Sequence, residues 1–158
     1  MLLAGVALLL RLSFEDLRRR RLPNRLIAEY GALCPLALLL SGASWTQWLQ
    51  HGAVAVVGFL VFLALFAVRA MGGGDVKLGT AVVAWTNIQD LVPTLLVISL
   101  TGLALALAGL LFDMPCLRRF FARGWRRRLR RALLVRRGVP YGAALAAGGL
   151  FAMPMYLR

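Results

Sequence analysis

The chain has 158 residues, of which 61% are hydrophobic, and its mean hydropathy is +0.78. This composition excludes an ordinary soluble domain and indicates a polytopic membrane protein. The formal net charge of +13 lies almost entirely in short stretches between apolar segments, which is typical of cytosolic loops of membrane proteins, so no nucleic-acid partner is expected.

Six apolar segments follow one another, and each predicts a helix because no alternating barrel pattern is visible. They cover residues 1–14, 25–40, 51–68, 78–89, 91–112 and 138–157. A helix needs about 20 residues to cross a bilayer, so the third, fifth and sixth segments are long enough, whereas the first and fourth are short. The sequence predicts an all-α, polytopic membrane protein with about six transmembrane helices, forming one membrane-embedded domain over residues 1–158.

The positive charges predict the orientation of these helices. Lys and Arg concentrate in residues 18–25, 69–77 and 114–138, whereas residues 41–50 and 87–90 contain neither. Because cytosolic loops carry an excess of Lys and Arg, the three basic segments are expected in the cytosol and both termini outside.

Two features are expected at the membrane surfaces. Trp45, Trp48 and Trp85 lie near the arginine-free ends, where an interfacial aromatic belt is expected. The 114–138 loop interleaves ten arginines with apolar residues, which predicts an amphipathic helix on anionic lipid at the cytosolic surface.

Asp75 is the first candidate functional residue, because an ionised carboxylate at the edge of an apolar segment is costly and usually has a task. The residues before it are Gly72, Gly73 and Gly74. Glycines let another backbone come close to the carboxylate. The structural alternative is that the glycines end one helix and Asp75 caps the next, which would begin at Val76. Lys77 would orient Asp75 or anchor this loop at the lipid headgroups.

Asp16 is the second candidate, and the predicted orientation places it on the same side as Asp75. The structural alternative is a solvated charge at a helix end, balanced by the arginines that follow it. Its neighbour Glu15 is a rival, although a helix would bring Glu15 near Arg11, four residues away. Glu29, within the second segment, would either snorkel or line a polar cavity.

Two aspartates that converge at one membrane face indicate acid–base hydrolysis of a peptide bond. Other hydrolytic chemistries lack the residues they need. The single histidine, His51, is expected on the outer side, the serines have no nearby base, and a zinc site lacks ligands. Neither a metal nor a cofactor is therefore expected. Of the other acids, Asp90 falls on the outer side, while Asp113 could approach the site.

Three stretches resemble motifs of one known family, the type IV prepilin peptidases, which are membrane aspartyl proteases with a Gly-x-Gly-Asp motif. Residues 72–78 are similar to the Gly-x-Gly-Asp-x-Lys stretch of that family. Residues 16–24 resemble its other aspartate motif, with Leu22 where isoleucine is usual. Pro140-Tyr141-Gly142 also looks like a family feature. The resemblance covers essentially the whole chain.

The resemblance implies an endopeptidase of the bacterial inner membrane that cleaves the basic leader of pilin-like precursors at the cytosolic face, for a pilus or a secretion machine. It implies that Asp16 and Asp75 are catalytic. The residues it implies in binding or support are Gly72, Gly73, Gly74, Lys77, Arg18, Pro23 and Asn24. Larger members carry a methyltransferase domain with CxxC motifs, which this chain lacks, so it looks like the small Tad/Flp-type member.

Two alternatives from other classes remain open. A non-enzymatic membrane subunit of a pilus or secretion machine would use both acids structurally. A small transporter would place ionisable groups near the bilayer midplane, but the middles of the long segments carry no charge.

Overall fold

The computed structural model describes residues 1–113 and 141–155, and every regular element in these residues is an α-helix. The helices are α1 (Leu2–Arg19), α2 (Asn24–Leu40), α3 (Trp45–Ala67), α4 (Gly73–Val83), α5 (Ile88–Asp113) and α8 (Tyr141–Met155). The prediction of an all-α fold is confirmed for this part of the chain. The surface helix expected over 114–138 lies outside the described residues.

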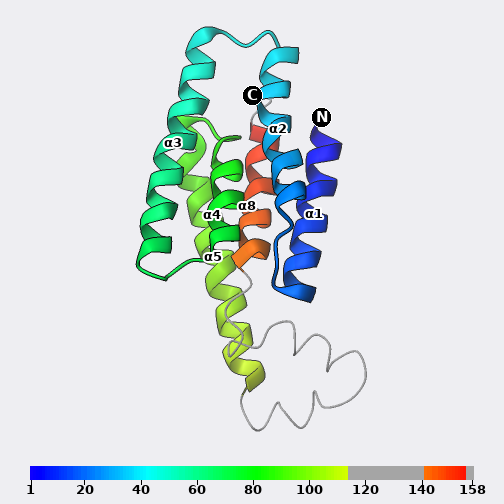
Figure 1. The fold of residues 1–158 in the computed structure, drawn as a ribbon, viewed down its shortest axis with the longest axis vertical. Coiled ribbons are helices and arrows are strands. Elements are labelled where there is room, and N and C mark those ends of the chain that lie inside the picture. Colours follow the sequence, from blue (N-terminus) through cyan, green and yellow to red (C-terminus); the bar gives the residue numbers. More distant parts are fainter. Residues whose placement is uncertain (114–140, 156–158) are drawn as a thin grey trace.

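Consecutive helices alternate in direction along the bundle (Figure 1). As a result, α1 begins and α8 ends at one end of the bundle, whereas the loops after α1 and α3 lie at the other. Among the described helices, α3 and residues 88–111 of α5 are long and apolar enough to cross a membrane.

Two helices form the centre of the packing. α8 contacts α1, α4 and α5, and α4 contacts α2, α3 and α8. The main core lies between α1, α2, α4 and α8. Its fully buried members include Leu9, Tyr30, Leu78 and Leu145, one from each of these helices. This arrangement places the first turns of α4 and α8 at the same end of the bundle as the end of α1 (Figure 1).

The far end of α4 lies inside the bundle. Its 11 residues span about 16 Å, roughly half of a bilayer core. A helix that ends away from water needs side-chain partners for its last carbonyl groups. The carbonyl oxygen of Ala84 accepts a hydrogen bond from Cys34 Sγ at 3.2 Å and lies 2.7 Å from His51 Nδ1. Because a carbonyl only accepts, Nδ1 must carry the proton in this contact.

The predicted surface position of Trp85 is wrong. Trp85 is fully buried, and its ring centroid lies 6.0 Å from that of Tyr30. The fourth segment was predicted to run from residue 78 to 89, but α4 begins at Gly73 and ends at Val83. The chain therefore turns inside the bundle, and Trp85 fills the space beyond the short helix. Trp45, in contrast, is exposed at the start of α3.

The contact between α3 and α4 depends on glycines that let the helices approach closely. A Cβ atom on Gly58 of α3 would lie 2.5 Å from Cγ2 of Val83 in α4. Gly79 of α4 faces the ring of Phe62 in α3 in the same way, at 2.8 Å. Small residues at such contacts strengthen helix packing in membranes.

We expect Gly58→Ala to lower the thermal unfolding temperature of the detergent-solubilised protein. The added methyl group collides with a branched side chain, and overpacking of this kind costs about 1–3 kcal/mol. Gly52→Ala is the matched control, since it lies in the same helix and its Cβ would meet nothing within 4 Å. An alanine there should raise the temperature slightly. Equal effects of the two substitutions would contradict the close α3–α4 contact.

Candidate active site

Asp16 lies in the last turn of α1 and is 6% exposed. The helix ends at Arg20, whose φ of 54° is left-handed and whose backbone N–H donates to the carbonyl oxygen of Asp16 at 2.9 Å. The chain then reverses through Leu22 into α2. Leu22 packs close to Gly74 of α4 and Gly142 of α8, so this short loop joins three helices around Asp16.

Asp75 lies in the first turn of α4, whose N-cap is Gly72. The helix begins at Gly73, so the alternative in which it begins at Val76 with Asp75 as its cap is wrong. Asp75 instead occupies the third helical position, from which an acidic side chain can reach back to the N-cap N–H. A Cβ atom on Gly72 would lie 2.9 Å from Asp75 Oδ2, so a larger residue there would press on the carboxylate.

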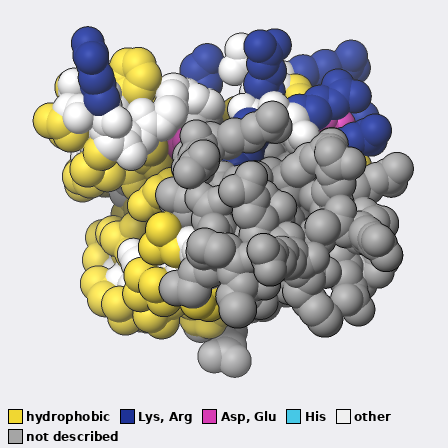
Figure 2. Space-filling model, turned by 90° about the horizontal axis from the view of Figure 1, so that it is seen from below, with side chains coloured by type: hydrophobic (Ala, Val, Ile, Leu, Met, Phe, Trp, Pro, Cys, Tyr) yellow, Lys and Arg dark blue, Asp and Glu magenta, His cyan; other side chains and the backbone are white. Residues whose placement is uncertain are grey.

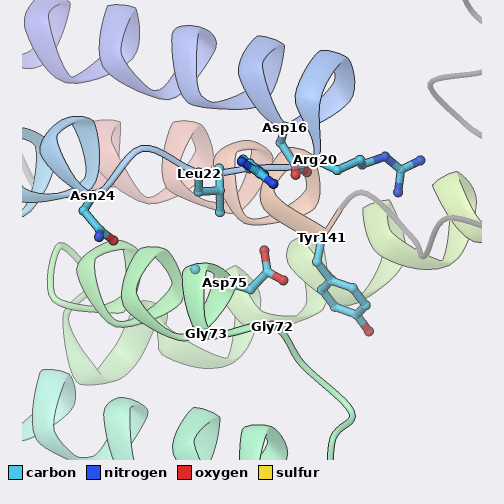
Figure 3. Close-up of a pocket in the computed structure, with 10 residues that line it drawn as sticks. Asp16, Arg20, Leu22, Asn24, Gly72, Gly73, Asp75 and Tyr141 are labelled. Carbon is cyan, nitrogen blue, oxygen red and sulfur yellow. The ribbon is translucent and has the colours of Figure 1, made fainter.

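Both aspartates line one cavity of about 520 Å³ between α1, α4 and the start of α8. Their carboxylates point into the space between α1 and α4 (Figure 3). The lining residues are Asp16, Arg20, Arg21, Leu22, Asn24, Gly72, Gly73, Gly74, Asp75 and Tyr141. The volume is in the range of ligand-binding clefts, so a short peptide segment can enter it.

The first turn of α8 binds the carboxylate of Asp16. The backbone N–H of Ala143 donates to Asp16 Oδ2 at 3.2 Å. Gly142 is buried directly against the same group, because a Cβ atom there would lie 2.9 Å from both Cγ and Oδ2 of Asp16. A helix N-terminus favours a negative charge, since its first N–H groups have no partner within the helix.

Burial has the largest influence on the acidity of both aspartates, which lie outside the two long apolar helices of residues 45–67 and 88–111. Burial raises the pKa of Asp16 from 3.8, while hydrogen bonds from Ala143 and Gly142 and the positive charge of Arg20 oppose that rise. Burial, as the larger cause, and the negative charge of Asp16 together raise the pKa of Asp75 to about 6, against a backbone hydrogen bond from Gly72 that lowers it. Near neutral pH the two groups can share one proton.

The cavity lies at the basic end of the bundle. Figure 2 views this end, and Lys and Arg side chains gather along its upper edge. Arg20 and Arg21 belong to the lining itself.

The predicted supporting residues divide into two groups. Gly72, Gly73, Gly74 and Asn24 line the cavity. Lys77 contacts the site only through Asn24, to whose Oδ1 its Nζ donates at 3.1 Å. Pro23 is the N-cap of α2, and Arg18 is exposed with its guanidinium 6.0 Å from the ring centroid of Phe14.

The remaining acids lie elsewhere. Glu15 pairs with Arg19, one turn further along α1, at 3.2 Å, and not with Arg11 as expected. Glu29 is exposed and pairs with Arg25 at 3.0 Å, so it lines no polar cavity. Asp113 ends α5, and its side chain lies outside the described residues.

Sequence reasoning missed Arg20 and Arg21 as lining residues, because a run of arginines after an apolar segment is typical of any cytosolic loop. It noted Tyr141 and Gly142 only as part of a motif. The signal that could have found them is that a glycine next to a helix start leaves backbone N–H groups accessible to an anion.

The raised pKa of Asp75 predicts that the stability of the fold depends on pH. Its folded pKa of about 6 exceeds the ordinary value of 3.8, so the folded protein binds more protons between these values. Its contribution therefore becomes less favourable as pH rises from about 4 to about 6. Asp75→Asn carries no charge, so we expect it to be more stable than wild type at pH 7, by on the order of 1 kcal/mol. The difference should vanish below pH 4. Thermal unfolding in detergent across this range measures it, and a constant difference would contradict the shift.

Comparison with known proteins identifies the family. A family model described as the type IV leader peptidase family matches residues 3–107, about two thirds of the chain. This range contains both Asp16 and Asp75. No match to a curated protein or to a solved structure is significant. With a match over more than half of its length, the chain belongs to the type IV leader peptidase family.

Proposed function

We propose that this protein is a prepilin peptidase and that Asp16 and Asp75 hydrolyse one peptide bond of a pilin-like precursor. The observation that carries the proposal is that the two carboxylates point into one cavity at the basic end of the bundle (Figure 3). Family membership supports a leader peptidase in general. Within that family, we propose a Flp-type precursor as the substrate.

The proposed reaction needs one proton on the pair. The ionised carboxylate takes a proton from a water molecule, whose oxygen attacks the carbonyl carbon of the scissile bond. The protonated carboxyl donates its proton to the carbonyl oxygen, which gives a tetrahedral diol. When the C–N bond breaks, the first group returns its proton to the leaving amine, and the second recovers one from the diol. Such acid–base catalysis requires carboxyl groups of different acidity.

The glycines of α4 support binding of an extended substrate. Gly73 and Gly74 line the cavity, so a substrate backbone can come close to Asp75. The arginines at the rim repel a basic leader, so direct attraction does not explain recognition. We propose that anionic lipid holds the leader and that the hydrophobic helix of the precursor packs against the apolar bundle.

We expect Asp16→Asn and Asp75→Asn each to reduce cleavage by at least about 100-fold, because each removes one of the two acid–base roles. Co-expression with a Flp-type precursor and immunoblotting for the processed band measures this, with the membrane level of each variant checked. Glu15→Gln is the matched control, because Glu15 adjoins Asp16 and pairs outside the cavity with Arg19. Processing that survives either aspartate change would reject the two-aspartate reaction and favour a non-enzymatic subunit.

We also propose six spans in the inner membrane with both termini outside and the cavity facing the cytosol. Alternating helix directions and the arginines at one end support this orientation (Figure 1). α4 and α8 would cross within the bundle, where α2, α3 and α8 contact α4.

A labelling experiment tests this topology. In a background of Cys34→Ala and Cys116→Ser, we expect a membrane-impermeant maleimide to label Thr46→Cys in intact cells. Ala70→Cys should react only after the membrane is opened, because it belongs to the loop between α3 and α4, which lies at the same end of the bundle as the cavity (Figure 1). Both positions are exposed, so accessibility depends on the side of the membrane. The reverse labelling pattern would overturn the orientation.

A further inference from the structure

The carboxylate of Asp16 rests on the backbone of α8. Besides the 3.2 Å hydrogen bond from Ala143, the missing side chain of Gly142 lets this turn come within contact of Cγ and Oδ2. Any Cβ at position 142 would lie 2.9 Å from Asp16, closer than real Cβ contacts come, and 3.0 Å from Leu22, which is tighter than most of them. The carboxylate or the helix would then have to move.

The two aspartates receive unequal support for a negative charge. Asp16 receives backbone hydrogen bonds from Ala143 and Gly142, and Arg20 adds a positive charge. Asp75 receives one backbone hydrogen bond, from Gly72, and faces the charge of Asp16. An N–H group stabilises the ionised form of a carboxyl group, so the contacts favour ionisation at Asp16.

We propose that Gly142 and Ala143 are positioning residues that hold Asp16 as the carboxylate, which makes Asp16 the base that deprotonates water and Asp75 the acid that protonates the carbonyl oxygen. The assignment rests on the proposed peptidase function. It also extends the site beyond residues 3–107, the range matched by the family model, into the last helix.

Few titratable groups other than Asp16 line the cavity in the part of the chain that the structure describes. They are Asp75 from α4, Arg20 and Arg21 after α1, and Tyr141 from α8, while α2 contributes the neutral Asn24. Arginine stays charged at all relevant pH values, so the two aspartates are the acidic groups of the described lining that change charge on titration.

The first test follows Asp16 without using activity. In Asp75→Asn protein in detergent, Asp16 is the remaining carboxyl group of the described cavity lining. Its titration is the infrared difference in the carboxyl stretch between this protein and the same protein with Asp16→Asn added. Adding Gly142→Ala should raise the midpoint by about one pH unit, because it displaces the N–H donors. Gly149→Ala is the matched control in the same helix, where a Cβ would lie 2.8 Å from Leu9 of α1. It should leave the midpoint unchanged.

The second test measures cleavage of a Flp-type precursor that is reconstituted together with the protein, and in this test Asp75 is kept. Gly142→Ala should lower kcat about 10- to 100-fold, change KM less than about threefold, and move the acidic limb of the pH profile upward. Ala143→Pro removes the donor N–H at a position in the first helical turn where proline is tolerated. It should act in the same direction if Gly142→Ala does not fold.

The outcomes separate this inference from the proposed function. If the Asp16 midpoint and the acidic limb in Gly142→Ala and Ala143→Pro match those of Gly149→Ala, the positioning role is overturned while the peptidase proposal stands. If Asp16→Asn still cleaves the precursor, the peptidase proposal itself fails.

Discussion

One constraint governs the residues around the cavity: a carboxylate buried in an apolar helix bundle needs hydrogen bonds or a positive charge in place of water. Moving an ionised carboxylate out of water costs several kcal/mol unless hydrogen bonds or opposite charges replace the lost hydration. Asp16 is 6% exposed, and its compensation comes from outside its own helix. The first turn of α8 supplies the N–H groups, and Arg20 supplies the positive charge. Docking of α8 therefore stabilises the fold and sets the chemistry of the cavity together.

Local helix position alone would favour the opposite distribution of charge. Asp75 lies at the N-terminus of α4, where the helix dipole favours an anion, whereas Asp16 lies at the C-terminus of α1, where it does not. Each such effect is worth about 0.3–1 kcal/mol. A hydrogen bond to a charged group contributes about 1.5–3 kcal/mol, so the contacts from α8 outweigh the dipole of α1. A tertiary contact thus overrides what each helix would impose by itself.

Several features could be predicted because they follow from composition and charge. The apolar segments indicated the helices, and the arginines placed Asp16 and Asp75 at one end before any fold was known. The start of α4 could not be predicted, because Gly73 and Gly74 have low helix propensity. Their helical conformation accompanies tertiary packing, of Gly73 beside Phe66 of α3 and of Gly74 beside Leu22 of the α1–α2 loop. The burial of Trp85 was missed for a related reason, since apolar residues at a span end fit a membrane surface or a core equally well.

The hydrogen-bond partners of Asp16 could not be predicted from the sequence, because they depend on the register of α8 against α1. That register is set by glycines on separate faces of α8. Gly142 and Gly149 are seven residues apart, about two turns, and both face α1, against Asp16 and Leu9 respectively. Gly148 faces Ile98 of α5 instead, where a Cβ would overlap that side chain.

The close contacts of these three glycines, on two faces of α8, fix the position of the helix along its axis. Sliding the helix by one residue, about 1.5 Å along its axis, would place side chains where glycines now sit and would break the Ala143 hydrogen bond. The packing of an apolar helix thereby fixes the position of two backbone N–H groups at the opposite end of the same helix. A Cβ on Gly149 meets the end of the Leu9 side chain, which can shift, so the position of α8 depends on the three contacts together and not on the contact at Gly149 alone.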